Sequence, residues 1–327
     1  MEQELMDRCD LFAVNHSLLS SQFKWDSDLM NYAAATVYTS QMKEIEPERM
    51  KECLAVLKSK TGELSEYRGN IKTTLLSKMA LSDDPASYFD RVEQVYKLLH
   101  KSVWMGNEHK LLAAVTICEH KQPEEYQKYV DRTNEIYDCM KKKHSWLTSD
   151  EDIPFAAMLA VSDLSIDRMI ENMEEMYAVL KKEFYDNNAV QSLSHVLCLV
   201  PESSEVKCEK VIQIYRELKA RKHKFGSGYE LTILGALTAL PLSVEQIVDR
   251  VIEADDYLKS KKGFGDLGLG SSNRRLYAAL MVMDTYKKDC TTKGDILLGS
   301  VLTMTITMEI CLIIAIMTIN TTVITNS

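Results

Sequence analysis

The glycines of GFGDLGLG, residues 263–270, have the spacing of a nucleotide-binding loop. Gly263, Gly265 and Gly268 fit G-x-G-x-x-G, in which a turn between a strand and a helix holds a pyrophosphate. Here the preceding segment, VEQIVDRVIEADDYLKSKK, has helical periodicity, and FGSG at 225–228 takes the same place about 40 residues earlier. We therefore predict a loop between helices, with a phosphate site as the alternative.

The seven histidines could act as acid–base groups or metal ligands. None has H-x-x-x-H or H-E-x-x-H spacing, so we predict no metal site and no cofactor. His195, in the apolar run SLSHVLCLV, is predicted to be a core histidine. His100, His144 and His223 lie near basic helix ends, where a protonated imidazole complements the helix dipole. A ligand or pH-sensing role is the alternative for these three.

Neighbouring carboxylates occur in SDD (82–84), SDEDIP (149–154) and EADDY (253–257). These segments lie at predicted helix ends and turns, where helix capping explains them. The sequence has no G-x-S-x-G, P-loop or kinase signature. No catalytic residue is therefore assigned, although a site assembled from several helices would escape a motif search.

Clusters of lysine and arginine recur at the predicted ends of amphipathic helices. The residues proposed as an interaction edge are Lys141, Lys142, Lys143, Lys181, Lys182, Arg221, Lys222, Lys261 and Lys262. Complementation of the helix dipole explains them without a partner. The alternative is a positive edge that binds an acidic peptide, an anionic lipid surface or RNA. A net charge of −9 argues against RNA, and no nucleic acid is expected.

The composition is that of a folded helical protein, with 46% hydrophobic and 27% charged residues and only 12 glycines and 6 prolines. The eight cysteines have no C-x-x-C spacing and mostly lie in apolar runs, which predicts reduced core thiols. The N-terminal MEQELMDRCDLF has no apolar signal region. We therefore expect a cytoplasmic protein.

Five prolines reveal an internal repeat. They are Pro47, Pro85, Pro123, Pro201 and Pro241, with gaps of 38, 38, 78 and 40 residues. Before each comes a short apolar run, and after it an amphipathic run that is acidic at its start and basic at its end. Proline suits the first turn of a helix, where its missing N–H costs nothing. Each period of about 40 residues is thus predicted to be a helical hairpin.

An aromatic residue closes most of these repeats. The series is Trp104, Trp146, Phe184, Phe225 and Phe264, interpreted as core or inter-repeat packing. The repeats predict an all-α protein, an α-solenoid-like array of about six hairpins with N- and C-terminal capping helices. The predicted parts are a cap helix at 1–27, hairpin repeats at 28–272, a terminal helix and linker at 273–295, and an apolar C-terminal segment at 296–327.

These features resemble a bacterial family, domain of unknown function 4003, found mainly in Firmicutes. The resemblance spans nearly the whole chain and rests on LMNYAAATVYT, LLAAVTIC, FAAMLAVS, FGSGYELTILGALTAL and the apolar C-terminal run. It implies that this run belongs to the architecture of the family, although the residues here are larger than the small ones typical of it. It implies no functional residue.

The run VLTMTITMEICLIIAIMTIN, residues 301–320, leaves three alternatives. As a strand, it would alternate at first but lack a partner. As a membrane span, Leu297 to Ile319 is long enough, yet Glu309 at its centre makes insertion marginal. As a closing helix, it would cover the last hairpin or a partner's face, which would also permit oligomerisation. We favour the closing helix.

The function predicted from the sequence is a cytoplasmic binding or scaffold module without catalytic activity, with a protein or peptide partner. Two alternatives remain open. One is an enzyme or small-ligand sensor with a pocket inside the helical array. The other is a protein associated with the membrane through Leu297–Ile319.

Overall fold

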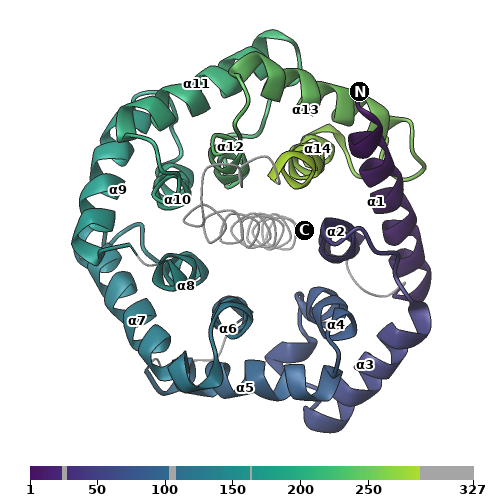
Figure 1. Cartoon of the computed structure of the whole chain (residues 1–327). Coiled ribbons are helices and arrows are strands. Elements are labelled where there is room, and N and C mark those ends of the chain that lie inside the picture. The colour runs from purple at the N-terminus through teal and green to yellow at the C-terminus, as the bar shows by residue number, and fades with distance from the viewer. Residues whose placement is uncertain (24–27, 103–107, 163, 288–327) are drawn as a thin grey trace. The chain divides into compact units, whose positions relative to one another are not determined.

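The fold is all-helical, as predicted (Figure 1). The computed structural model describes residues 1–23, 28–102, 108–162 and 164–287. This part of the chain contains α-helices α1 to α14 and three short 3-10 helices, η1 (Glu66–Arg68), η2 (Pro123–Glu125) and η3 (Asp150–Asp152). The first helix, α1, is Gln3–Gln22.

The even-numbered helices are buried along most of their length. They are α2 (Asp28–Ser40), α4 (Lys72–Leu81), α6 (Glu108–His120), α8 (Ile153–Val161), α10 (Asn187–Leu197), α12 (Leu231–Leu237) and α14 (Ser271–Tyr286). Every residue of α8, with the sequence IPFAAMLAV, is buried. A helix that is apolar all round has no face suited to water. The short apolar runs of the sequence are these helices.

The odd-numbered helices after α1 bury one face. They are α3 (Pro47–Lys60), α5 (Pro85–Ser102), α7 (Tyr126–Lys143), α9 (Ile166–Leu180), α11 (Ser204–Ala220) and α13 (Val244–Lys259). In α9 the buried residues recur every three or four positions, at Met169, Ile170, Met173, Met176, Tyr177 and Leu180. This spacing gives an apolar stripe on one side and leaves the other to solvent.

Two of the predicted helix starts differ from the structure. Pro47 and Pro85 begin α3 and α5, as expected. After Pro201 and Pro241, however, the helices begin three residues later. Ser203 and Ser243 cap α11 and α13, each with a side-chain oxygen that accepts a hydrogen bond from a backbone N–H in the first turn. A serine cap satisfies a free helical donor, which proline cannot do, and it therefore sets the boundary.

The described chain divides into two compact units, neither of which is continuous in sequence. Unit 1 contains Met1–Asp10, Cys139–Thr148 and the described residues of 162–287. Unit 2 contains Leu11–Asp138 and Ser149–Val161. Helices α1 and α7 therefore contribute residues to both units.

Within each unit the buried helices form one layer and the amphipathic helices another (Figure 1). In unit 1, α10 packs against α9 and α12, α14 packs against α12 and α13, and α11 packs against α9 and α13. In unit 2, α4 packs against α2, α3 and α5, and α6 packs against α5 and α8. The arrangement of the hairpins as a solenoid stays a prediction.

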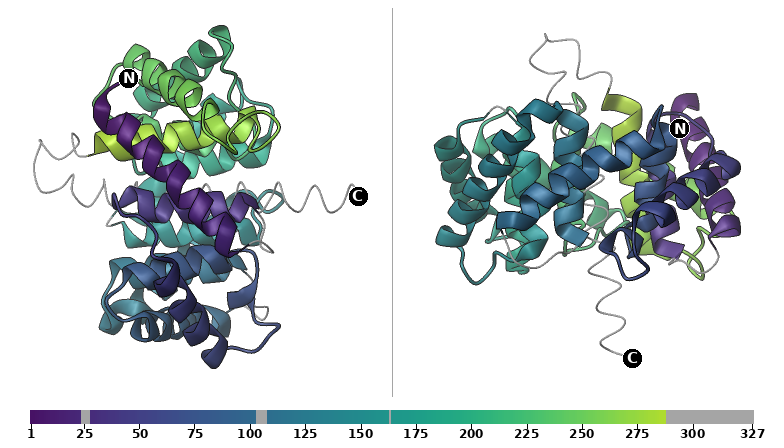
Figure 2. Two further views of the ribbon diagram at one scale, coloured as in Figure 1. Left: turned by 90° about the vertical axis from the view of Figure 1, so that its right-hand side faces the viewer. Right: turned by 90° about the horizontal axis from the view of Figure 1, so that it is seen from below.

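The first ten residues of the chain lie next to α13 in unit 1 (Figure 2). Glu2 Oε1 forms an ion pair with Arg250 Nη2 at 2.5 Å. Tyr257 Oη shares its one proton between Asp10 Oδ1 and Oδ2, at 3.0 and 2.9 Å, and Asp10 also forms an ion pair with Lys261. The first half of α1 is thereby joined to a helix almost 250 residues away.

The cysteines that the structure describes are free thiols, as predicted. Five of these six are buried, and Cys139 is partly exposed. Burial raises the pKa of the Cys9 thiol to about 12 and that of Cys53, Cys198 and Cys208 to about 11. Because the thiolate is the reactive form, these four thiols are poor nucleophiles.

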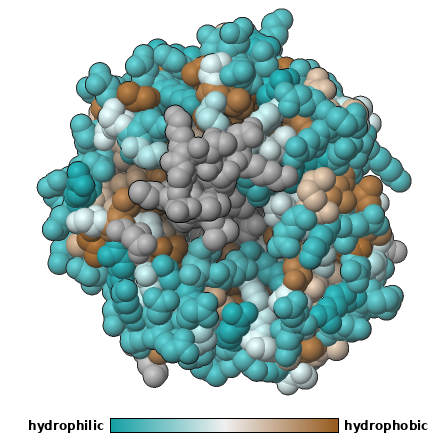
Figure 3. All heavy atoms as spheres, in the orientation of Figure 1, coloured by the Kyte–Doolittle hydropathy of each residue, from teal (hydrophilic) through white to brown (hydrophobic). Residues whose placement is uncertain are grey.

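The predicted apolar C-terminal segment, 296–327, lies outside the described residues, as do residues 288–295 of the predicted terminal helix and linker. Among the described helices, none combines the length and the apolar character that crossing a bilayer requires. On the face drawn in Figure 3, the hydrophobic side chains of the described residues form small separate groups among hydrophilic ones.

Candidate functional site

The C-terminal ends of α7, α9, α11 and α13 lie along one edge of unit 1. His144, directly after α7, contacts α9 through a 2.8 Å hydrogen bond between its Nε2 and Glu174 Oε1. The ring of Phe184, after α9, packs edge-on against Tyr215 of α11, with centroids 5.0 Å apart. Each contact joins the loop after one helix to the last two turns of the next, so the two helices end side by side.

A third contact of the same kind joins α11 to α13. His223, after α11, has its Nδ1 2.9 Å from Asp255 Oδ2 near the end of α13. We call the surface formed by residues 141–146, 181–185, 221–224 and 261–267 the basic edge.

All nine residues predicted for the interaction edge belong to this surface. Lys141, Lys142 and Lys143 form the last turn of α7. The other six follow the ends of α9, α11 and α13, namely Lys181, Lys182, Arg221, Lys222, Lys261 and Lys262. Eight of the nine are exposed, and Lys261 is partly buried. The contacts of His144, Phe184 and His223 described above link each of these segments to the next helix in the series.

Two of the nine side chains are held by carboxylates within the protein. Arg221 Nη1 lies 2.5 Å from Asp249 Oδ1. Lys261 pairs with Asp10, donates to Tyr257 Oη at 3.1 Å and lies 4.1 Å from the centre of that ring. The hydrogen bonds to Asp10 and Tyr257 raise the pKa of Lys261 above its usual value. These two residues connect elements of unit 1.

Four other lysines leave their charge to solvent. Lys142, Lys182, Lys222 and Lys262 are exposed, and they make no ion pair with any residue that the structure describes. They come from the ends of all four helices. Each of the four segments of the basic edge therefore carries at least one solvent-exposed positive charge, although the chain as a whole is acidic.

The aromatic residues that close the repeats do not all pack as predicted. Phe184, Phe225 and Phe264 are buried, as expected. Trp146 is 97% exposed, so its interpretation as packing was wrong. The short turn after α7 carries Trp146 outward, while Leu147 N and Thr148 N donate to His144 O behind it. Trp104, the other tryptophan of the series, lies outside the described residues.

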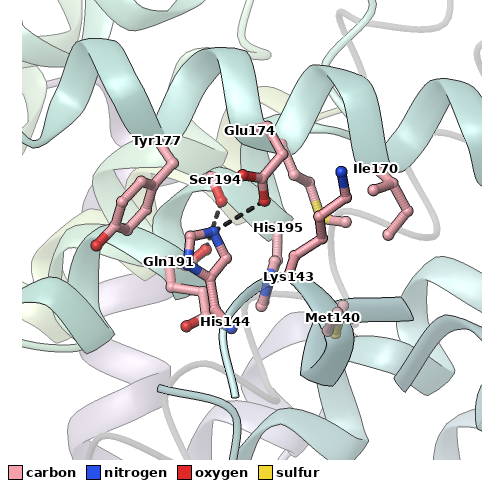
Figure 4. Close-up of a pocket in the computed structure, with 10 residues that line it drawn as sticks. Met140, Lys143, His144, Ile170, Glu174, Tyr177, Gln191, Ser194 and His195 are labelled. Carbon is pink, nitrogen blue, oxygen red and sulfur yellow. Dashed lines mark hydrogen bonds and ion pairs between the residues drawn. The ribbon is translucent and has the colours of Figure 1, made fainter. Parts of the chain in front are cut away.

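A small pocket lies beside the basic edge, between the end of α7, α9 and α10 (Figure 4). Its polar lining includes His144, Glu174, Gln191, Ser194 and His195. Ser194 Oγ donates to the backbone oxygen of Gln191 at 2.7 Å, and His144 holds Glu174 as described. The pocket has room for about one water molecule, so it is too small for a substrate.

Two buried groups determine the chemistry of this pocket. His195 is 2% exposed, as predicted for a core histidine. Burial, with a smaller contribution from His144, lowers the pKa of His195 to about 3, so its imidazole is neutral at pH 7. Gln191 Nε2 donates to Thr148 Oγ1 at 3.0 Å, but Gln191 Oε1 has no hydrogen-bond partner among the described residues. A single water donating to Gln191 would satisfy it.

Comparisons with known proteins identify the family. The sequence matches the family described as "Protein of unknown function (DUF4003)" over residues 15–318, most of the chain. The chain belongs to the DUF4003 family. This confirms the resemblance seen in the sequence. One relative is the uncharacterized protein YeaA of Bacillus subtilis (strain 168), 22% identical over 271 residues, which are 81% of each chain. No solved structure matches the chain.

In this DUF4003 protein the segment GFGDLGLG is a loop between α13 and α14, as predicted. Leu269 N donates to Gly263 O at 2.9 Å, which closes the loop. Gly268 approaches the backbone of Gly263 so closely that a Cβ would lie 2.1 Å from its oxygen. Gly268, the third glycine of the G-x-G-x-x-G spacing, thus serves to close the loop.

A buried ion-pair network holds this loop against the helices. Asp255 of α13 is 1% exposed, and its Oδ1 lies 2.6 Å from Arg274 Nε of α14. Arg274 Nη1 also donates to Phe264 O at 3.1 Å and to Asp266 Oδ1 at 3.0 Å. Asp255 Oδ2 faces His223 at 2.9 Å and Arg275 Nε at 3.4 Å. The network joins three elements: helix α13, helix α14 and the loop that follows α11.

Two residues of this network and the neighbouring Asp256 offer ligand atoms for a metal. Atoms of His223, Asp255 and Asp256 lie within 4.8 Å of one another. Both oxygens of Asp255 already face basic groups, and Arg274 and Arg275 place two permanent positive charges beside it. A divalent cation would meet repulsion there, so this arrangement favours the ion pairs.

The sequence reasoning missed two exposed residues of the basic edge. Tyr185 is 98% exposed in the loop after α9, and Leu267 is fully exposed in the loop after α13. Each follows a buried phenylalanine, Phe184 or Phe264, within three positions. The sequence did contain a sign of this exposure, namely a second apolar residue shortly after the buried phenylalanine. A short loop that buries one apolar side chain in the core can rarely bury the next one as well.

Proposed function

We propose that the protein is a cytoplasmic binding module without catalytic activity, and that the basic edge contacts an anionic macromolecular partner. The observation that carries this proposal is the row of exposed lysines at the ends of four successive amphipathic helices. Such a row focuses a positive field on one surface of an acidic chain, which attracts and orients a partner of opposite charge.

The solenoid-like arrangement of hairpins is part of this proposal. Each described contact between a loop and the next amphipathic helix joins residues about 30 positions apart, such as His144 with Glu174 and Arg221 with Asp249. Lys60 and Asp90 in unit 2 form an ion pair of the same separation. This regularity supports a stack of equivalent hairpins, in which equivalent surface residues line up.

The alternative of an enzyme or small-ligand sensor gains no specific support from the pocket. Its volume suits one water molecule, which would satisfy Gln191 Oε1 and leaves no room for a substrate. The membrane association proposed through Leu297–Ile319 concerns residues outside the described part of the chain and stays a prediction.

The proposal is tested by retention of the full chain on an immobilised polyanion, polyglutamate. A chain with net charge −9 should pass through unless one surface binds locally. We expect retention at about 50 mM salt and release on screening by about 0.5 M salt. Neutralising Lys142, Lys182, Lys222 and Lys262 to glutamine should abolish retention.

A matched control neutralises basic residues at the opposite ends of two of the same helices. Lys128→Gln and Arg168→Gln lie in the first turns of α7 and α9 and are both exposed. This control should elute with the unmodified chain. Circular dichroism checks that all variants remain helical, because lysines near helix ends each contribute about 0.3–1 kcal/mol to stability. Absence of retention, or equal loss in control and edge variants, contradicts the proposed function.

A further inference from the structure

We infer that the basic edge binds the surface of an anionic phospholipid bilayer, with Trp146, Tyr185 and Leu267 entering the headgroup region. This inference rests on the proposed function, because it names the chemistry of the partner. It differs from the predicted C-terminal membrane span because it places the protein on the membrane through folded residues of unit 1.

Three of the most exposed apolar side chains of unit 1 lie on the basic edge. Trp146 is 97% exposed, Tyr185 is 98% exposed and Leu267 is fully exposed. They come from the loops after α7, α9 and α13, three of the four loops that form the edge. Hydrophobic residues of this size cost free energy in water, since burying such a side chain releases about 1.5–3 kcal/mol.

Each of these side chains has solvated lysines close in sequence. Lys142 lies four positions before Trp146, Lys182 three positions before Tyr185, and Lys262 five positions before Leu267. Tryptophan and tyrosine are enriched at the membrane–water interface, where an apolar ring with a polar edge suits the headgroup level. Lysines near an anionic membrane surface contribute about 1 kcal/mol each. The edge combines both contributions.

The separation of the apolar side chains favours a bilayer over a protein partner. Protein interfaces have a closely packed, continuous core, and large exposed apolar patches usually mark them. Here the three side chains stand on three loops with charged residues between them, as in Lys181, Lys182 and Asp186 around Tyr185. A fluid headgroup layer accommodates each side chain separately and supplies negative charge to every lysine cluster.

Vesicle co-sedimentation of the full chain tests this inference. We expect binding to vesicles of phosphatidylcholine with about 30% phosphatidylglycerol and much weaker binding to pure phosphatidylcholine, because the lysines need anionic headgroups. Binding should fall at about 0.5 M salt as the charges are screened. Equal binding to both kinds of vesicle overturns the inference, because binding would then not depend on contacts between the lysines of the basic edge and anionic headgroups.

The decisive variant removes the three apolar side chains and keeps every lysine. Trp146→Ser, Tyr185→Ser and Leu267→Ser together should weaken binding to anionic vesicles at least about tenfold, because binding scales with the apolar area buried in the interface. The side chains are exposed, so the fold should persist. A control, Leu164→Ser with Val206→Ser, removes exposed apolar residues near the starts of α9 and α11 and should bind as the unmodified chain does.

Fluorescence gives a second readout. The chain has three tryptophans, so replacing Trp25 and Trp104 by phenylalanine leaves Trp146 as the emitter. Its emission should shift to shorter wavelength on adding anionic vesicles, and brominated lipids should quench it. Unchanged emission with bound protein overturns the inference.

The two proposals fail in distinguishable ways. Retention on polyglutamate without binding to anionic vesicles leaves the proposed function standing and overturns the lipid inference, in favour of an acidic protein partner. Loss of both contradicts both. Binding to vesicles that survives the triple serine variant also overturns the inference. Support requires that the triple variant still bind polyglutamate while losing the vesicles.

Discussion

Burial changes the acid–base behaviour of His195 strongly. His195 belongs to α10, and its side chain faces α9 and the C-terminal end of α7. Burial there favours the neutral imidazole and lowers the pKa of His195 to about 3. An unfolded histidine has a pKa near 6.5. The difference connects the stability of unit 1 to pH.

We predict that His195 makes the protein less stable in acid. Because the folded pKa lies below the unfolded one, its contribution is complete above about pH 6.5 and is lost as the pH falls toward about 3. The loss is at most about 1.4 kcal/mol per pH unit. In His195→Gln, the free energy of unfolding measured in urea should decline less between pH 7 and pH 4.5, by roughly 2 kcal/mol.

The matched control for this measurement is His100→Gln, which changes an exposed histidine. It should keep the pH dependence of the unmodified chain. Parallel pH profiles for His195→Gln and the unmodified chain would show that another group is responsible.

At this scale the sequence predicted His195 well and Trp146 badly. The run SLSHVLCLV is apolar on both sides of His195, so burial follows from local composition. Trp146 sits in HSWLTS, a short polar turn in which local composition does not decide the direction of a side chain. Trp146 has the same spacing of about 40 residues as the buried phenylalanines, which suggested that it is buried too. The spacing places a residue in a loop, but it does not determine whether the side chain points toward the core or toward solvent.

The loop between α13 and α14 shows how an element can depend on one backbone contact. Its closure brings Gly268 against the carbonyl of Gly263, and its two ends position Phe264 and Leu269 in the core. The loop also supplies Leu267 to the basic edge.

We predict that Gly268→Ala destabilises the protein by about 1–3 kcal/mol, since its Cβ would overlap a backbone oxygen that cannot move alone. Gly265→Ala in the same loop is the control, because a Cβ there meets nothing within 4 Å. It should stay within about 0.5 kcal/mol of the unmodified chain. Urea unfolding measures both. Similar midpoints for the two variants would show that the loop opens at little cost.

At the scale of elements, the sequence predicted the helices but not the network that joins them. Apolar runs and amphipathic runs have different periodicities, so both helix types could be recognised, and basic ends marked where α7 and α11 stop. Asp255, Arg274 and His223 could not be connected in this way. They lie on three different elements, and the carboxylates of EADDY were attributed to capping.

At the scale of the whole molecule, the described chain joins its beginning to α13 within unit 1. Tyr257 donates its hydroxyl proton to the carboxylate of Asp10, and Arg250 pairs with Glu2. No periodicity relates these residues, so the sequence predicted a helix at 1–27 without its packing partner.

We predict that Asp10→Ala loosens this junction. The variant loses the hydrogen bond from Tyr257 and the ion pair with Lys261, which should lower the free energy of unfolding by about 1–2 kcal/mol. Amide hydrogen exchange should accelerate in the first turns of α1 and in α13. Asp7→Ala, which loses a local hydrogen bond from Gln3, is the control and should exchange as the unmodified chain does. Equal exchange in both variants would contradict the role given to Asp10.

The same junction has a consequence for biosynthesis. Asp10 leaves the ribosome 247 residues before Tyr257, which at about 5–20 residues per second is a delay of roughly 12–50 s. During that time the first turns of α1, including the apolar Leu5 and Cys9 that are buried in the finished fold, lack their partner helix. The first turns of α1 therefore stay without their partner helix while the described residues of unit 2 are translated, which leaves Leu5 and Cys9 accessible to a chaperone near the exit tunnel.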